Sequence, residues 1–148
     1  MAEKFLFDLQ QWPELGARYW IFVENFKIDE TVTPSDITGI EIGPMELESS
    51  LIVYCRKYSK TPIEEISGEG LRILLGQNLH LEVIVPATLC LLERNPFESC
   101  DFEDGVLMRT LFLRVENNYW KKNPSHYQIA LDVFRVASAK LSRIFFYV

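Results

Sequence analysis

The chain of 148 residues lacks the motifs by which enzymes and metal proteins are most readily identified from sequence. It contains no GxSxG nucleophile elbow, no GxxxxGK[ST] phosphate loop and no GxGxxG dinucleotide fingerprint. Its two histidines, His80 and His126, stand apart, without partners at metal-ligand spacing. Histidines in such a setting are far more often structural than catalytic. We therefore expect no catalytic residue, no metal site and no cofactor.

Long apolar runs and paired cysteines are also missing. No stretch approaches the roughly 20 apolar residues that a membrane helix needs. The N-terminus has no basic region followed by an apolar segment, so we expect no signal peptide. Cys55, Cys90 and Cys100 are odd in number and lack CxxC spacing, which argues against a disulfide framework. These features predict a cytoplasmic protein in a reducing compartment, with no membrane partner.

Positive charge is scarce relative to negative charge. Fifteen Lys and Arg residues face twenty-one Asp and Glu residues, which gives a formal charge of −6. An acidic surface repels phosphate backbones, so direct nucleic-acid binding is disfavoured, while encounter with a basic protein is favoured. Many cytosolic proteins are acidic simply because charge keeps them soluble, so charge alone identifies no partner.

The rest of the composition is that of one ordinary folded domain. Hydrophobic residues make up 48% of the chain and charged residues 24%, and no linker or repeat divides it. Aromatic residues reach 13%, which indicates a dense core or an aromatic surface left for a partner. We predict a single, mainly α-helical domain over 1–148, with a helical core at 49–141 and an aromatic N-terminal part at 1–48.

Apolar residues recur at steps of three and four along that core, which predicts amphipathic helices. Ser67 should cap one helix, which Gly76 and Asn78 should end. The next helix contains Pro86, which should kink it or mark its start, and ends at Asn95-Pro96. Two apolar stripes are expected to be buried: Leu47, Leu51, Tyr54, Cys55 and Tyr58 on the first helix, and Tyr127, Leu131, Phe134 and Leu141 on the last. The aromatic segments near residue 20 and at 144–148 are candidates for a small strand pair.

Acidic residues gather in two turn-like segments: Glu64 and Glu65 in the first, and Glu98, Asp101, Glu103 and Asp104 in the second. The simplest interpretation is a well-hydrated face. A sharper one is an electrostatic footprint for a basic partner. Paired carboxylates can also perform acid–base chemistry when their environments separate their pKa values. The twelve-residue spacing of a calcium loop is absent, so no metal is expected there.

Several segments taken together resemble a known family. They are LIVYCRKYSKTPI at 51–63, LRILLGQN at 71–78, VIVPATL at 83–89 and LERNPF at 92–97, followed by DF at 101–102. In this order they are similar to the immunity proteins of bacterial contact-dependent growth inhibition (CDI) systems, the CdiI family, and Trp120 and Pro124 also fit. The resemblance covers about 50–124. It departs at 103–106, where relatives tend to carry a Tyr-Pro-Gly-Asp-like turn and this chain has EDGV.

The resemblance implies a non-catalytic toxin inhibitor. Such a protein binds the C-terminal toxin domain of the exported effector CdiA and neutralises it. Many of these toxins are nucleases with basic clefts, which an acidic inhibitor can cover. The acids at 98–104 are therefore the first expected contacts, and Glu64 and Glu65 the second. Two other classes stay open: a small carboxylate-dependent hydrolase, which needs acids in a concave pocket, and an adaptor or regulatory module, which needs an exposed apolar groove.

Overall fold

The computed structural model describes residues 32–145, with side chains described up to residue 139. Every regular element in this range is helical, which confirms the prediction of a mainly α protein. None of the described helices combines the length and the apolar character needed to cross a bilayer. In chain order the elements are α2 (Pro34–Thr38), α3 (Ser50–Ser59), the 3-10 helix η1 (Ile63–Glu65), α4 (Gly68–Gly76), α5 (Leu81–Arg94), α6 (Val106–Arg114), α7 (Asn117–Lys122) and α8 (Pro124–Phe145).

The residues at the helix ends explain where the helices begin and end, because capping side chains form hydrogen bonds with otherwise unpaired backbone amides. Ser49 and Ser67 cap α3 and α4, and the hydroxyl of Ser67 accepts from the amide of Gly70 at 3.1 Å, as predicted. The last residue of α4 is Gly76, and Asn78 follows with a φ of 52°, a left-handed conformation that asparagine tolerates. The end of α5 at Arg94, just before Asn95-Pro96, also confirms the prediction.

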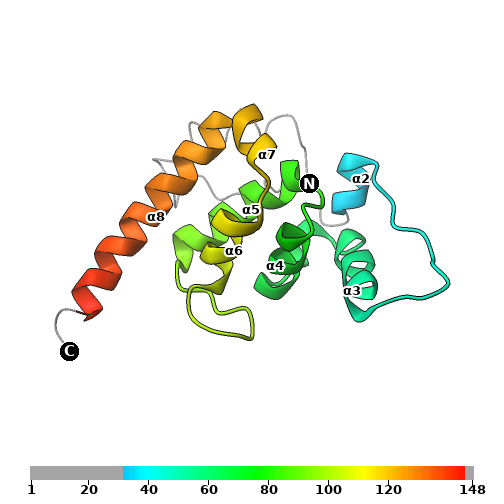
Figure 1. Cartoon of the computed structure of the whole chain (residues 1–148), viewed down its shortest axis with the longest axis horizontal. Coiled ribbons are helices and arrows are strands. Elements are labelled where there is room, and N and C mark those ends of the chain that lie inside the picture. The colour runs from blue at the N-terminus through cyan, green and yellow to red at the C-terminus, as the bar shows by residue number, and fades with distance from the viewer. Residues whose placement is uncertain (1–31, 146–148) are drawn as a thin grey trace, which may run out of the picture.

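Helix α5 forms the centre of the core. Its apolar side chains pack against α4, α6 and α8, and α4 also packs against α6. In Figure 1, α4, α5 and α6 lie in the middle of the molecule, with α2 and α3 at one end and α8 running out towards the other. Pro86 lies inside α5 and is buried, so it does not mark the start of this helix. The largest fully buried side chains are Leu74, Leu75, Ile84, Leu89, Leu92, Leu107, Leu111 and Ile129.

Two histidines are part of this packing. The ring of His80 lies between the hydroxyl groups of Thr38 and Ser59 and so joins α2 and α3 to the start of α5. The Nδ1 atom of His126 lies 2.8 Å from the hydroxyl of Tyr119, which joins α8 to α7. Both rings are buried, in agreement with the structural role expected for them.

The predicted stripe on the first helix is only partly buried. Helix α3 begins at Ser50, so Leu47 lies in the preceding loop and is 90% exposed. Leu51 and Tyr54 are also exposed, whereas Cys55 is buried and Tyr58 packs against the core. The prediction was wrong at the exposed positions because α3 lies at one end of the molecule. Its main contact is with α4, so one narrow face is covered.

The stripe predicted for the last helix is also on the wrong face. Helix α8 buries Ile129, Ala130, Val133 and Ala137, which follow steps of three and four, while Tyr127 and Phe134 are exposed. The buried face contains two alanines, and small side chains allow close approach to α5, with which α8 packs. The side chain of Leu141 lies outside the described residues.

The described residues contain no β-strand. The segment near residue 20 and residues 146–148 lie outside them, so the predicted strand pair falls for the most part beyond this description. Ile144 and Phe145, however, belong to the last turn of α8 and are not extended.

Candidate partner-binding surface

The acidic segment at 98–104 is part of an ordered loop between α5 and α6. Two backbone hydrogen bonds close it. The amide of Gly105 donates to the carbonyl of Phe97 at 3.2 Å, and the amide of Phe102 donates to the carbonyl of Ser99 at 2.7 Å. Cys100 and Asp101 have φ values of 48° and 64°, and Gly105 has 86°, so the chain turns through three left-handed residues. These hydrogen bonds and turns fold the loop back on itself.

The side chain of Cys100 anchors this loop in the core. It is buried, and burial, followed by the nearby Glu98 and Glu69, raises the pKa of its thiol to about 12. The carboxylate of Glu98 accepts from the amide of Cys100 at 3.1 Å. It also lies against α4, where a Cβ on Gly68 would come within 2.9 Å of the Glu98 carboxyl. Glu98 thus stabilises the loop itself.

The other three acids of the loop point outward. Asp101 and Asp104 are exposed. Glu103 is exposed as well, and it forms an ion pair with Arg109 of α6. Between them, Phe102 is 66% exposed, and the guanidinium of Arg72 lies over its ring, 4.4 Å from the centroid.

The two predicted acidic segments adjoin the same end of α4. Glu64 and Glu65 are exposed on η1, which ends two residues before the capping Ser67. The loop at 98–104 reaches the first turns of α4 through Glu98 against Gly68 and Phe102 against Arg72. The fold therefore brings to the same end of α4 two acidic segments that are more than 30 residues apart in sequence.

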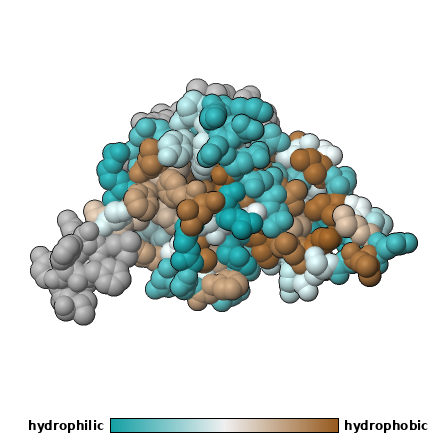
Figure 2. Space-filling model, viewed as in Figure 1, coloured by the Kyte–Doolittle hydropathy of each residue, from teal (hydrophilic) through white to brown (hydrophobic). Residues whose placement is uncertain are grey.

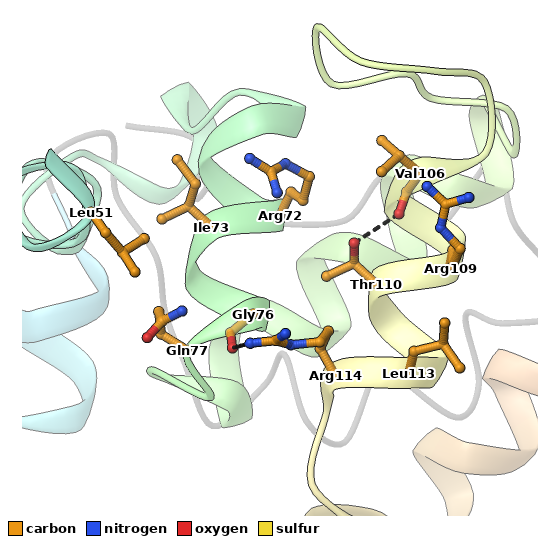
Figure 3. A pocket seen from close by; sticks show the side chains of 10 residues that line it. All are labelled: Leu51, Arg72, Ile73, Gly76, Gln77, Val106, Arg109, Thr110, Leu113 and Arg114. Carbon is orange, nitrogen blue, oxygen red and sulfur yellow. Dashed lines mark hydrogen bonds between the residues drawn. The ribbon is translucent and has the colours of Figure 1, made fainter.

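A groove lined by arginines lies beside this loop. It runs between α4 and α6 and has a volume of about 340 Å³. We call it the arginine groove. Figure 3 shows Arg72 and Arg109 near the loop end and Arg114 at the opposite end, where its guanidinium donates to the carbonyl of Gly76 at 3.1 Å. Arg72 is held by both carboxylate oxygens of Glu69, at 2.9 and 2.5 Å. Among the described residues, no carboxylate lies within ion-pair distance of Arg114.

A second groove, here called the apolar groove, lies on the other side of α6, against α8. It has a volume of about 500 Å³ and is lined mainly by apolar side chains. The rings of Phe112 and Phe134 meet there edge to face, with centroids 5.6 Å apart. Figure 2 shows apolar side chains at the surface where α6 meets α8. The lining consists of Pro96, Phe97, Gly105, Met108, Arg109, Phe112, Leu113, Leu131, Phe134 and Ala137.

Sequence reasoning missed both grooves. The arginine groove brings together residues of two helices that only the tertiary fold makes neighbours, so no local pattern signals it. The apolar groove had a signal: α8 carries two helical stripes, and the prediction that the more aromatic one is buried was wrong. That stripe, with Phe134, lines the groove instead.

The linings of the two grooves bear on the classes that the sequence left open. Neither groove has an Asp or Glu in its lining, whereas a carboxylate-dependent hydrolase requires acids in a pocket. Within residues 32–145 no group of three or more His, Cys, Asp or Glu side chains is placed to hold a metal ion. An exposed apolar groove is what the adaptor interpretation required, and it is equally what a dedicated protein inhibitor can use.

Comparison of the chain with known protein families identifies a match. The family model of the CDI immunity proteins matches residues 36–130, from α2 to the first turns of α8, and so extends beyond the segments at 50–124 that carry the resemblance in the sequence. No curated protein and no solved structure matches the chain significantly. Because the family model matches well over half of the chain, the chain belongs to the CDI immunity proteins.

Proposed function

We propose that this protein neutralises its cognate toxin by binding, in the cytoplasm and without turnover, the C-terminal toxin domain of the exported effector CdiA. The observation that carries the proposal is the family match over residues 36–130. The three free, buried cysteines suit a reducing compartment. An interface of roughly 1,600 Å² is the usual size for such a complex.

We further propose that the toxin is a nuclease and that the acidic loop meets its basic surface. A nuclease cleft must attract phosphate, so it attracts carboxylates as well. Asp101 and Asp104 are the leading contacts because both are exposed at the loop tip. Glu103 can contribute while still paired with Arg109. Glu98 acts indirectly by holding the loop. Glu64 and Glu65, on η1 just before the N-cap Ser67 of α4, extend the acidic surface.

Co-expression with the toxin domain tests the inhibitor function. The toxin alone should arrest growth, and this protein should restore growth and elute with the toxin as one complex from a sizing column. In a nuclease assay, a stoichiometric amount should abolish cleavage. Continued arrest with no complex would refute immunity against that toxin. A toxin that is neutralised but cleaves no nucleic acid would refute the nuclease assignment alone.

Charge reversal tests the acidic contacts. In the double variant Asp101→Lys with Asp104→Lys, the association rate with the toxin should fall by at least ten-fold at low salt, because exposed charges mainly steer encounter. Glu46→Lys combined with Glu82→Lys is the matched control, since it also reverses two exposed acids and neither lies in the acidic loop. An association rate equal to that of the control would place the electrostatic contact elsewhere.

The hydrolase and adaptor alternatives make different predictions. A hydrolase would show turnover that disappears with a single pocket substitution. An adaptor would bind a resident protein and give no protection against a toxin. The apolar groove is compatible with an adaptor, but the family match favours a toxin as the partner.

A further inference from the structure

Helix α6 separates the two grooves and contributes to both. Arg109 and Leu113, one helical turn apart, line the arginine groove on one side and the apolar groove on the other. Leu113 is 73% exposed, and Arg109 is exposed as well. The two hollows are therefore parts of one surface, with α6 as its ridge. We call this the α6 face.

The α6 face is locally positive in an acidic chain, because Arg72 and Arg109 are each paired with one carboxylate and Arg114 with none among the described residues. The protein carries a formal charge of −6, yet three arginines surround the groove between α4 and α6. A guanidinium has five N–H donors, and the bonds described above use only some of them. Arg114 gives one to the carbonyl of Gly76, Arg72 uses two nitrogens for Glu69, and Arg109 uses one nitrogen for Glu103. The remaining donors can bind carboxylates of a partner.

The apolar groove supplies the other half of a protein-binding surface. Its large apolar side chains remain partly open to solvent, and Phe134 is 48% exposed despite its contact with Phe112. Exposed apolar patches rimmed by polar groups mark interaction sites, and the strongest anchors of protein complexes are bulky side chains seated in such hollows. An occupant of the whole face must therefore combine an apolar anchor with acidic residues.

We propose that the α6 face is a docking site for an acidic segment of the toxin domain that carries a bulky apolar side chain. The apolar side chain enters the groove between α6 and α8, and neighbouring carboxylates bind Arg109 and Arg114. The identity of the partner rests on the proposed function, but the location and the chemistry of the contact do not depend on the acidic loop. The toxin then presents two surfaces, a basic one to Asp101 and Asp104 and an acidic, apolar one to α6.

Four single variants of the full chain, measured for binding of the purified toxin domain by calorimetry, test this docking site. Arg114→Glu and Leu113→Glu change one side chain in each part of the face and should each raise the dissociation constant by ten-fold or more. Lys121→Glu on α7 and Val136→Glu on α8 make the same changes at exposed positions outside both linings and should alter it less than two-fold. Thermal unfolding of each variant verifies that the fold is kept.

The outcomes distinguish this docking site from the proposed function. If the wild type binds and neutralises the toxin while Arg114→Glu and Leu113→Glu bind like the controls, the α6 face is not the docking site, although immunity stands. If the wild type binds no toxin, the proposed function is refuted, and with it the toxin as the occupant of the α6 face. If sedimentation shows a wild-type dimer that Leu113→Glu dissociates, the face is an interface between two copies and the toxin assignment is overturned.

Discussion

The imidazole Nε2 of His80 lies 2.8 Å from the hydroxyl of Ser59, and both side chains are buried. On its other side the ring approaches the hydroxyl of Thr38 through Nδ1 at 2.7 Å. His80 itself has a φ of 53°, so the backbone turns sharply where the ring is placed. One side chain thus connects the last residue of α2, the last residue of α3 and the start of α5.

Removing the hydroxyl of Ser59 should destabilise the protein. Ser59→Ala leaves one nitrogen of a buried ring without a partner, which costs about 1–3 kcal/mol in free energy of unfolding. Urea denaturation measures the loss. Ser50→Ala, at an exposed position on the same helix, should change the free energy by no more than about 0.5 kcal/mol. Equal effects of the two substitutions would mean that the His80 contact contributes nothing.

Acidification should destabilise the fold through its two histidines. Burial lowers the pKa of both His80 and His126, although Glu41 partly opposes the effect at His80. Both rings therefore favour the neutral form when folded. Their contribution is fully present above the ordinary pKa of 6.5 and is lost as pH falls below that value towards the lower folded pKa.

The urea midpoint should accordingly be lower at pH 5.0 than at pH 7.5. His80→Asn supplies the control: it removes one of the titrating rings and keeps a residue that tolerates positive φ. The pH dependence of this variant should be weaker than that of the wild type. An unchanged dependence would show that His80 does not contribute to it.

Two glycines of α4 should respond in opposite ways to alanine. A Cβ at Gly70 would lie 2.6 Å from Cδ1 of Tyr58 and 2.7 Å from Cγ2 of the buried Ile66, so Gly70→Ala should lose about 1–3 kcal/mol through overpacking. A Cβ at Gly76 would meet nothing within 4 Å, and Gly76→Ala should gain about 0.5–1 kcal/mol. Thermal unfolding compares the two, and a stabilised Gly70→Ala would contradict the close contact of α3 and α4.

The cysteines should be inert in the folded protein. Burial raises the pKa of all three thiols, so little reactive thiolate forms at neutral pH. A thiol-specific chromogenic reagent should label the native chain slowly and should titrate three thiols after denaturation. Rapid labelling of one thiol in the native chain would indicate local opening, and Cys100→Ser would show whether the loop at 98–104 is responsible.

Helix positions could be predicted because their signals are local. Ser67 as a cap, Gly76 with Asn78 as a stop and Asn95-Pro96 as an end all act within a few residues, and the structure has them so. The covered face of each helix was harder to predict. Helix α8 offers an aromatic stripe and a stripe of small and branched residues, and both have helical spacing. Only packing against α5 decides between them, and that contact is not local.

The candidate site likewise has a part that the sequence predicts and a part that depends on the tertiary fold. The acidic loop was visible because its residues are contiguous in sequence. Its ion pair between Glu103 and Arg109 was not, and neither was the arginine groove, because these depend on how α4 and α6 lie side by side. Net charge is a sum over the whole surface, so it concealed a local region of the opposite sign.

The backbone bonds from Gly105 to Phe97 and from Phe102 to Ser99 have an evolutionary consequence. Main-chain groups close this hairpin-like turn, and Cys100 and Glu98 hold it from within, so its shape does not depend on which side chains project from the exposed positions 102 and 104. Mutations at those two positions can therefore alter recognition while the scaffold stays folded. An inhibitor built in this way can adapt to a changed toxin by substitution of a few exposed residues.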